Sequence, residues 1–489
     1  MAVDNSVAEK YKKIFHFSDN LRDGKVPTSA LRENDPYQYQ SGLGNHFESE
    51  AIPGTLPYGQ NNPRVSRFEL YTEQVTGSAF VTPRDKNKHS WLYRAQPSVA
   101  NFGTGPPPDI PDVEANFSLG NPHVQIAPTQ IGWLPFDMPQ TNEKVDFVQG
   151  LKAVAGSGDP YVGEGVAMHM YLANASMEKR AMVNCDGELL IVPQKGTLDI
   201  QTEYGNLWVQ PGEIVVIQRG QRFTVKLPDG QSRGYVQEVW GSYFELPNLG
   251  PLGSNSLASP RDFLSPIAAY DIDKSEWQIV YKQGGKFSAC IQDHSPYDVV
   301  AWSGNYVPYK YDLTKFIYVG SISVDHIDPS IFCCLTAKSK DPITPLVDFL
   351  VVGPRFDVSV HTYRPPYYHR NCASELMGFI HGEWMGPAEE FYPGGLHFET
   401  GFVPHGLEPK VYNKATSLEP PVMKIMEHDL GFMFESSRPL LITNWAWNHP
   451  RKHDHDHSNV WGGLDNKFIK YQQQISAVIP MESGDKRTH

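Results

Sequence analysis

Proline and glycine interrupt this chain at short intervals along its whole length. The 489 residues include 40 prolines and 41 glycines, which are scattered rather than gathered into linkers. Short apolar runs lie between them, for example over 188–192 and 213–217. Apolar runs of this length, bounded by turn-forming residues, are typical of strands. We therefore predict a fold dominated by β-strands.

The strand-like runs fall into two blocks. From Gly187 to Val225 they alternate with turn signals, the pattern of a double-sheet jelly roll or cupin barrel, and this segment contains no histidine. A second block covers about 299–404, and a proline- and glycine-rich connection over 246–255 separates the two. We predict a polar arm (1–36), a metal-free β-sandwich or cupin-like domain (37–275), a jelly-roll domain (276–447) and a polar tail (448–489).

Composition narrows the possible partners. The chain is 40% hydrophobic and 12% aromatic, as expected of a well-buried globular protein. Its 42 basic and 55 acidic residues give a net charge of −13, which disfavours nucleic acid or an anionic membrane as the main partner. The N-terminal residues lack the apolar core of a secretory signal, and no apolar run is long enough to span a membrane. We predict a soluble cytoplasmic protein with a small-molecule partner.

The cysteines agree with that compartment. The five cysteines cannot all pair, and the adjacent Cys333 and Cys334 would point to opposite faces of a strand. Buried free thiols in a reducing compartment are the simplest interpretation.

Two imidazoles and one carboxylate stand close together near the end of the second block. They are His369 and Glu375, in Tyr-His-Arg-Asn-Cys-Ala-Ser-Glu, and His405, in Pro-His-Gly. Two histidines and one carboxylate hold a divalent iron on one face and leave the other positions open for dioxygen and substrate. The pattern predicts a non-haem iron site.

The spacing of these residues leaves an alternative open. Six extended steps from His369 to Glu375 would cover about 20 Å, so a shared metal requires the chain to fold back between them. The polar residues 370–373 can form that turn. The alternative is that both histidines are ordinary hydrogen-bonded residues near a turn.

Several long strings resemble the homogentisate 1,2-dioxygenase family. They are YQSGLGNHFESEAIPGTLP (39–57), GSAFVTPR (77–84), VAGSGDP (154–160), LDIQTEYGNLWVQPGEIVVIQRG (198–220), GPLGSNSLASPRDF (250–263), RPPYYHRN (364–371) and FMFESS (432–437). The resemblance runs from Tyr37 to about Trp447. It implies Fe²⁺ bound by the equivalents of His369, Glu375 and His405. It further implies cleavage of homogentisate by O₂ to maleylacetoacetate in tyrosine and phenylalanine catabolism, and a hexamer built as a dimer of trimers.

Three positions depart from the family pattern. Ser303 stands where the family has a histidine that acts as a base, so its catalytic role is in question, since a hydroxyl is a poor proton acceptor near neutral pH. Trp384 replaces a tyrosine of the substrate pocket. A gapless alignment puts Glu399 in place of a histidine six residues before the last ligand, either facing the site or turned to solvent. We count Tyr368, Trp384, His397 and Glu399 as candidate pocket residues.

These departures leave alternatives to homogentisate cleavage. One is a paralogue that cleaves or oxidises a different hydroquinone or hydroxylated aromatic, including oxidation without ring opening. The other is a non-catalytic assembly protein that retains metal. The alternating His-Asp run over 453–457 is interpreted as part of a solvated tail with no assigned role.

Overall fold

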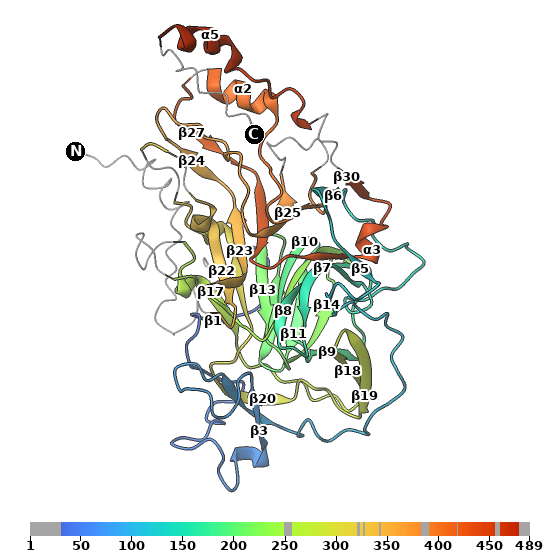
Figure 1. The fold of residues 1–489 in the computed structure, drawn as a ribbon. Coiled ribbons are helices and arrows are strands. Elements are labelled where there is room, and N and C mark those ends of the chain that lie inside the picture. Colours follow the sequence, from blue (N-terminus) through green and yellow to red (C-terminus); the bar gives the residue numbers. More distant parts are fainter. Residues whose placement is uncertain are drawn as a thin grey trace, which may run out of the picture.

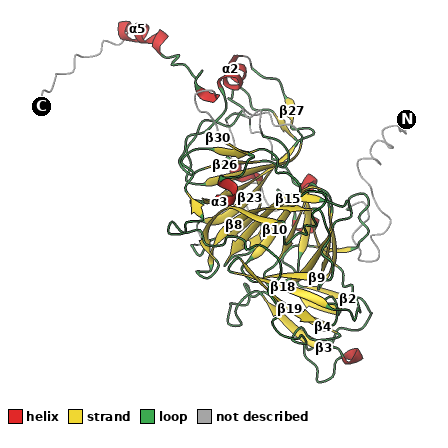
Figure 2. Ribbon diagram, turned by 90° about the vertical axis from the view of Figure 1, so that its right-hand side faces the viewer, coloured by secondary structure: helices red, strands yellow, loops and turns green. Residues whose placement is uncertain are grey.

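The computed structural model describes residues 31–248, 257–319, 323–325, 328–341, 344–382, 391–417, 419–454 and 460–478. Most of the ordered elements are strands, as predicted (Figures 1 and 2). The described helices are α2 (Pro409–Ser417), α3 (Asn444–Trp447) and α5 (Ile469–Val478), with short 3-10 turns at Arg67–Glu69, Pro260–Asp262, Leu313–Lys315 and Pro329–Phe332. None of the described helices is long and apolar enough to cross a membrane.

Two sheets build the N-terminal part of the molecule. The ten-stranded sheet runs in the order β1 (Tyr39–Ser41), β17 (Phe263–Pro266), β21 (Tyr309–Asp312), β13 (Glu213–Ile217), β10 (Glu188–Lys195), β15 (Ser232–Trp240), β8 (Glu164–Ala173), β7 (Leu151–Asp159), β29 (Leu441–Thr443) and β5 (Val124–Gln125). The six-stranded sheet runs in the order β12 (Gly205–Val209), β11 (Leu198–Thr202), β14 (Arg222–Lys226), β9 (Arg180–Asn184), β18 (Trp277–Gln283) and β19 (Lys286–Gln292).

Three further sheets complete the described fold. The eight-stranded sheet runs in the order β16 (Phe244–Glu245), β22 (Cys333–Lys338), β23 (Pro345–Val352), β28 (Leu430–Ser436), β25 (Ser374–His381), β26 (Leu396–Glu399), β6 (Ile131–Trp133) and β30 (Lys452–Asp454). A four-stranded sheet contains β2 (Phe47–Glu50), β20 (Val299–Gly304), β4 (His89–Arg94) and β3 (Tyr71–Thr76). The strands β24 (Arg355–Asp357) and β27 (Met423–Ile425) form a pair.

The ten-stranded sheet lies in the middle of the hydrophobic core and is buried on both faces. Along β10, Leu190 and Val192 pack into the cluster that includes Phe349 and Phe434 of the eight-stranded sheet. The alternate residues of β10 pack against the six-stranded sheet instead. Because successive side chains of a strand point to opposite faces, a strand buried on both faces needs a continuous apolar run. This requirement explains the uninterrupted runs at 188–192 and 213–217.

The predicted boundary between residues 275 and 276 falls just before β18. The strands β18 and β19 extend the six-stranded sheet, and β21 pairs with β13 and β17 of the ten-stranded sheet. Part of the predicted arm also contacts this region, because Arg32 forms an ion pair with Asp312 and Asp35 forms one with Lys310. Residues 1–30 of the arm lie outside the described part of the chain.

The segment interpreted as a solvated tail begins with a strand. β30 pairs with β6 at the edge of the eight-stranded sheet, and the ring of His453 lies over Gly132. A side chain at residue 132 would collide with this ring, because a Cβ there would lie 2.5 Å from His453 Cε1. Short edge strands that carry charged residues are a common way to end a sheet, which is why the polarity of this segment did not reveal a strand. His455, Asp456 and His457 lie outside the described residues.

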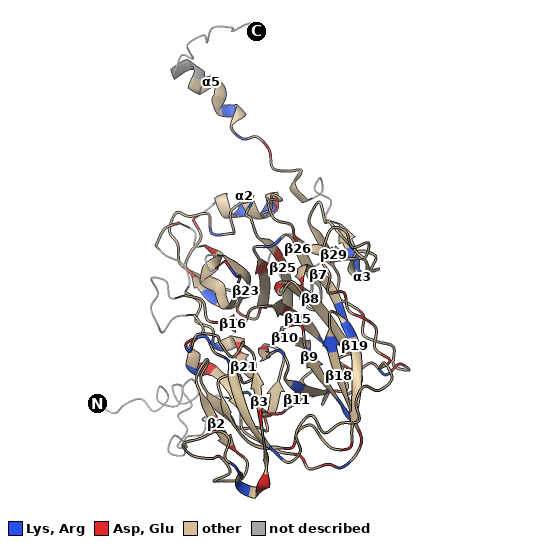
Figure 3. Cartoon of the chain, turned by 60° about the horizontal axis from the view of Figure 1, so that its bottom comes forward, with Lys and Arg blue, Asp and Glu red and all other residues tan. Residues whose placement is uncertain are grey.

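Charged residues lie mostly on loops, and the cysteines are free thiols. In Figure 3 acidic and basic residues are interspersed along the loops, whereas the strands consist mostly of other residues. All five cysteines are unbonded, and Cys290, Cys333 and Cys334 are buried as predicted. Cys185 is half-buried and Cys372 is exposed, so the prediction of buried thiols does not hold for these two.

Glu188 is a buried carboxyl group at the start of β10. Its side chain accepts a hydrogen bond from Phe244 N at 2.9 Å. Burial raises the pKa of Glu188 from 4.5 to about 8. Between these pH values the folded chain holds a proton that the unfolded chain releases, so this group lowers stability as pH rises, by at most about 1.4 kcal/mol per pH unit.

We expect Glu188→Gln to remove that pH dependence. Gln resembles the protonated acid in shape but does not titrate, so the variant should gain stability relative to the native chain as pH rises from 5 to 8. Urea unfolding at several pH values measures the difference. Parallel stability profiles for the two proteins would contradict the assignment.

Candidate metal centre

A backbone bridge brings the two predicted histidine ligands together. His369 N donates to His405 O at 3.0 Å, and His405 N donates to His369 O at 3.1 Å. The third candidate, Glu375, lies on β25 in the eight-stranded sheet. The chain therefore folds back between His369 and Glu375, as a shared metal requires, and the Asn371 side chain in this turn donates to Glu375 Oε1 at 2.7 Å.

Both imidazoles are held in the same way. His369 Nδ1 lies 2.8 Å from Tyr367 O, and His405 Nδ1 lies 2.9 Å from Val403 O. A carbonyl only accepts hydrogen bonds, so each Nδ1 carries a hydrogen, and in the neutral imidazole Nε2 presents a lone pair. The two Nε2 atoms are 2.8 Å apart. Two lone pairs at this separation repel one another unless a proton or a metal ion lies between them.

The donor atoms fit one divalent ion. Glu375 Oε1 lies 3.7 Å from His405 Nε2 and 4.0 Å from His369 Nε2. Donors about 2.1 Å from a common ion lie about 3 Å apart at a right angle and about 4.2 Å apart when opposed. Both Glu375 separations fall in this range, and the 2.8 Å between the two Nε2 atoms lies just below it. The ligand atoms of these three residues all lie within 4.8 Å of one another. Among the described residues, no other group of three histidine, cysteine, aspartate or glutamate side chains is close enough to share an ion.

Matches to known proteins cover nearly the whole chain. The model of the homogentisate 1,2-dioxygenase N-terminal domain matches residues 38–313, and that of the C-terminal domain matches residues 314–468. The chain belongs to the homogentisate 1,2-dioxygenase family. The sequence resemblance, and with it the prediction of an enzyme of the aromatic ring-opening dioxygenase type, is thereby confirmed. The family models meet between residues 313 and 314, whereas the boundary predicted from the sequence at 275/276 stays a prediction.

Curated members of the family are similar over most of their length. The human homogentisate 1,2-dioxygenase is 46% identical over 88% of this chain and 97% of its own. That of Dictyostelium discoideum is 48% identical over 90% of this chain and 100% of its own. Among solved structures, a quercetin 2,3-dioxygenase from Acinetobacter baumannii matches 63% of this chain and 79% of its own, with 8% identity and a TM-score of 0.25.

Within this family member, a row of carboxyl groups crosses the sheet that carries the metal ligand. Glu375 pairs in register with Glu399 of β26 on one side and with Glu435 of β28 on the other, and Glu435 pairs with Asp348 of β23. Residues directly opposite on adjacent strands point to the same face. Burial, together with the charges of Glu375 and Asp348, raises the pKa of Glu435 to about 7. The metal face of this sheet is therefore strongly acidic.

Glu399 points into the site and not to solvent. Its Oε1 lies 3.0 Å from His397 Nε2, its Oε2 lies 2.7 Å from His405 Nδ1, and the residue is buried. Burial opposes ionisation, but the contacts with His397 and His405 lower the pKa of Glu399 to about 2. The carboxylate raises the pKa of His405 to about 9 against the effect of burial. The solvent-facing alternative is wrong, because strand alternation places residues 397 and 399 on the face of Glu375.

The other candidate pocket residues differ in position. The Tyr368 ring packs over Gly406, and its hydroxyl donates to Leu407 O at 2.8 Å. Ser303 lies on β20, opposite Glu48 and Trp91, in the four-stranded sheet. This sheet is at the far end of the molecule from β25 and β26 (Figures 1 and 2). The structure thus does not bring Ser303 to the metal ligands of its own chain, and Trp384 lies outside the described residues.

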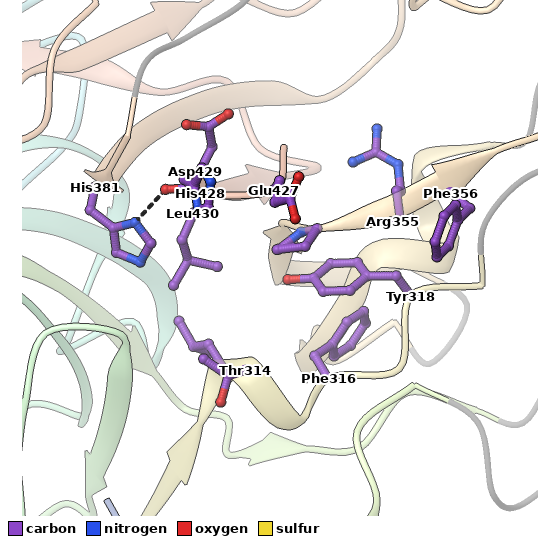
Figure 4. A pocket seen from close by; sticks show the side chains of 12 residues that line it. Thr314, Phe316, Tyr318, Arg355, Phe356, His381, Glu427, His428, Asp429 and Leu430 are labelled. Atoms are coloured by element: carbon purple, nitrogen blue, oxygen red, sulfur yellow. Dashed lines mark hydrogen bonds between the residues drawn. The ribbon is translucent and has the colours of Figure 1, made fainter. Parts of the chain in front are cut away.

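A cavity of about 510 Å³ lies near the far end of β25 from Glu375. Its lining includes Tyr318, His381 and Leu430, and it contains none of the predicted site residues (Figure 4). His381 Nδ1 is 2.9 Å from His428 O across part of its wall. This cavity is separate from the metal centre.

Sequence inspection missed three groups of the site. Asn371 orients Glu375, and Glu435 and Asp348 extend the row of carboxyl groups. Glu435 does interrupt an apolar strand in the string FMFESS, which is a signal of a special role. The sequence does not show which strands pair, so it could not reveal that Glu435 lies beside Glu375.

Proposed function

We propose that this protein is an Fe²⁺-dependent, extradiol-type ring-cleaving dioxygenase that converts homogentisate and O₂ to maleylacetoacetate in tyrosine and phenylalanine catabolism. The observation that carries the proposal is the convergence of His369, Glu375 and His405 within 4.8 Å. The family resemblance also supports a cytoplasmic location and a homo-oligomer, a hexamer built from two trimers.

The side chains supply a rigid set of donors. The carbonyls of Tyr367 and Val403 fix both imidazoles with Nε2 toward the shared position, and the Asn371 amide fixes the Glu375 carboxylate. Ferrous iron bound there supplies open positions at which a hydroxylated ring and dioxygen bind together, and it lowers the pKa of the ring hydroxyl. The protein residues on this face hold the metal on one side and leave the opposite side for substrate.

A second candidate substrate class is favoured by Glu399. Homogentisate carries an acetate group, and a buried carboxylate beside the ligands repels a second anion if the two approach one another. A neutral hydroquinone avoids this repulsion.

Oxygen uptake by the iron-loaded full chain tests both candidates. With homogentisate we expect one O₂ consumed per ring and, with ¹⁸O₂, both labelled atoms in the opened product. Neutral hydroquinones are compared in the same assay. Turnover of a neutral ring with little turnover of homogentisate would support the second class. A product with the ring intact would contradict ring cleavage, and iron-loaded protein that consumes no oxygen with any hydroxylated aromatic would contradict catalysis.

A further inference from the structure

We propose that Glu399 is a positioning residue that holds the His405 imidazole and strengthens the binding of the divalent metal. The inference rests on the proposed metal centre, because it takes His369, Glu375 and His405 as ligands. It assigns to this carboxylate a task separate from substrate binding.

The two histidine ligands differ on the side away from the shared position. The Nδ1 hydrogen of His369 has the Tyr367 carbonyl 2.8 Å away, and no carboxylate among the described residues lies within 4.0 Å of that nitrogen. His405 Nδ1 donates to Val403 O at 2.9 Å, and Glu399 Oε2 lies 2.7 Å from the same nitrogen. His405 alone is therefore backed by a full negative charge.

Glu399 is fixed where it stands. It pairs in register with Glu375, and His397, two residues earlier on β26, holds its Oε1 at 3.0 Å. Its Oε2 is buried and accepts no hydrogen bond from the described residues, so its 2.7 Å contact with His405 Nδ1 is a charge contact. A buried carboxylate oxygen without a donor needs a positive charge close by. A cation bound at His405 Nε2 would polarise the imidazole and place positive charge beside this oxygen.

An anionic partner on the outer nitrogen makes an imidazole a stronger ligand. Outer carboxylates of this kind orient the ring and raise its basicity, and their loss typically weakens metal binding 10- to 100-fold. Glu399 also brings a second negative charge to a divalent site whose only anionic ligand is Glu375. Both effects strengthen the binding of a divalent ion. They stabilise a ferric ion more than a ferrous ion, because the ferric ion carries the larger charge.

The test measures metal affinity in the full chain, stripped of metal and titrated anaerobically with Fe²⁺ or Co²⁺ against a competing chelator. We expect Glu399→Gln to raise the Kd about 10- to 100-fold, and Glu399→Asp, which keeps the charge, to recover part of the loss. The matched control is Glu427→Gln, which removes an exposed carboxylate of the same domain that is paired with Lys424. Its Kd should stay within about twofold of the native value.

The rate at which the bound Fe²⁺ oxidises in air separates this role from a loss of packing. The two would change that rate in opposite directions. The Fe²⁺ form of Glu399→Gln should oxidise more slowly in air than the native Fe²⁺ protein, because the ferric ion loses a stabilising charge. A folded Glu399→Gln variant with native affinity and a native oxidation rate would overturn the inference while leaving the proposed function intact. Failure of the native chain to bind either metal through His369 and His405 would overturn the proposed function itself.

Discussion

Replacing His405 by alanine should abolish metal-dependent oxygen uptake. The variant loses one of two nitrogen donors, and it leaves His397 as the remaining histidine partner of the buried Glu399 carboxylate. We expect metal affinity to fall by more than the roughly 100-fold that marks the upper range for losing an outer partner. Oxygen uptake with homogentisate should fall to the background of metal-free protein. His369→Ala and Glu375→Ala should behave alike, because each removes one donor of the same set.

The control for this experiment is another histidine on the same sheet. His381→Ala removes an imidazole near the far end of β25 from Glu375, where its Nδ1 contacts His428 O. This variant should keep one metal ion per chain and native oxygen uptake. Metal analysis after gel filtration and an oxygen electrode measure the two quantities. A His405→Ala protein that retains one tightly bound ion and native turnover would exclude the proposed ligand set.

The sequence was most informative where local chemistry decides the structure. The apolar runs at 188–192 and 213–217 predicted strands, and the structure places both in the sheet that is buried on two faces. The residue types at 369, 375 and 405 predicted a shared metal site, and a backbone bridge supplies the proximity that spacing alone left open. Both predictions rest on residue type and short-range pattern, which a single sequence displays.

The register between strands could not be predicted from the sequence. Asp348, Glu435 and Glu399 lie in separate stretches of sequence, and only the pairing of β23, β28, β25 and β26 aligns them with Glu375. The position of Ser303 is a similar case, because its place depends on β20 pairing with β2 and β4. The pairing of distant strands depends on the packing of the whole core, so it leaves no local signal.

Replacing Arg94 by leucine should lower the free energy of unfolding by at least about 3–5 kcal/mol at pH 7. The guanidinium has five N–H donors, and here five hydrogen bonds use them. Nε and Nη2 donate to Asp298 at 3.0 and 2.9 Å, and Nη2 also donates to Pro296 O at 2.8 Å. Nη1 donates to Glu73 at 3.0 Å and to Glu203 at 2.9 Å. Leucine fills part of the volume but removes the ion-pair partner of all three carboxylates, of which Glu73 and Glu203 keep only the more remote charge of Arg222.

The size of this effect follows from burial. The Arg94 side chain is 0% exposed, and those of Glu203 and Asp298 are 3% and 4% exposed, so water cannot replace the lost donors. The matched control is Arg451→Leu, which breaks an exposed pair with Asp137 and should change stability by no more than about 1 kcal/mol. Chemical unfolding at pH 7 and pH 5 measures both variants. The Arg94→Leu defect should shrink at pH 5, because burial already raises the pKa of Glu203 and loss of Arg94 raises it further, so that this carboxyl group takes up a proton and no longer buries a charge. A defect below about 1 kcal/mol at pH 7, or one that grows as pH falls, would show that these carboxylates do not depend on Arg94 for their charge.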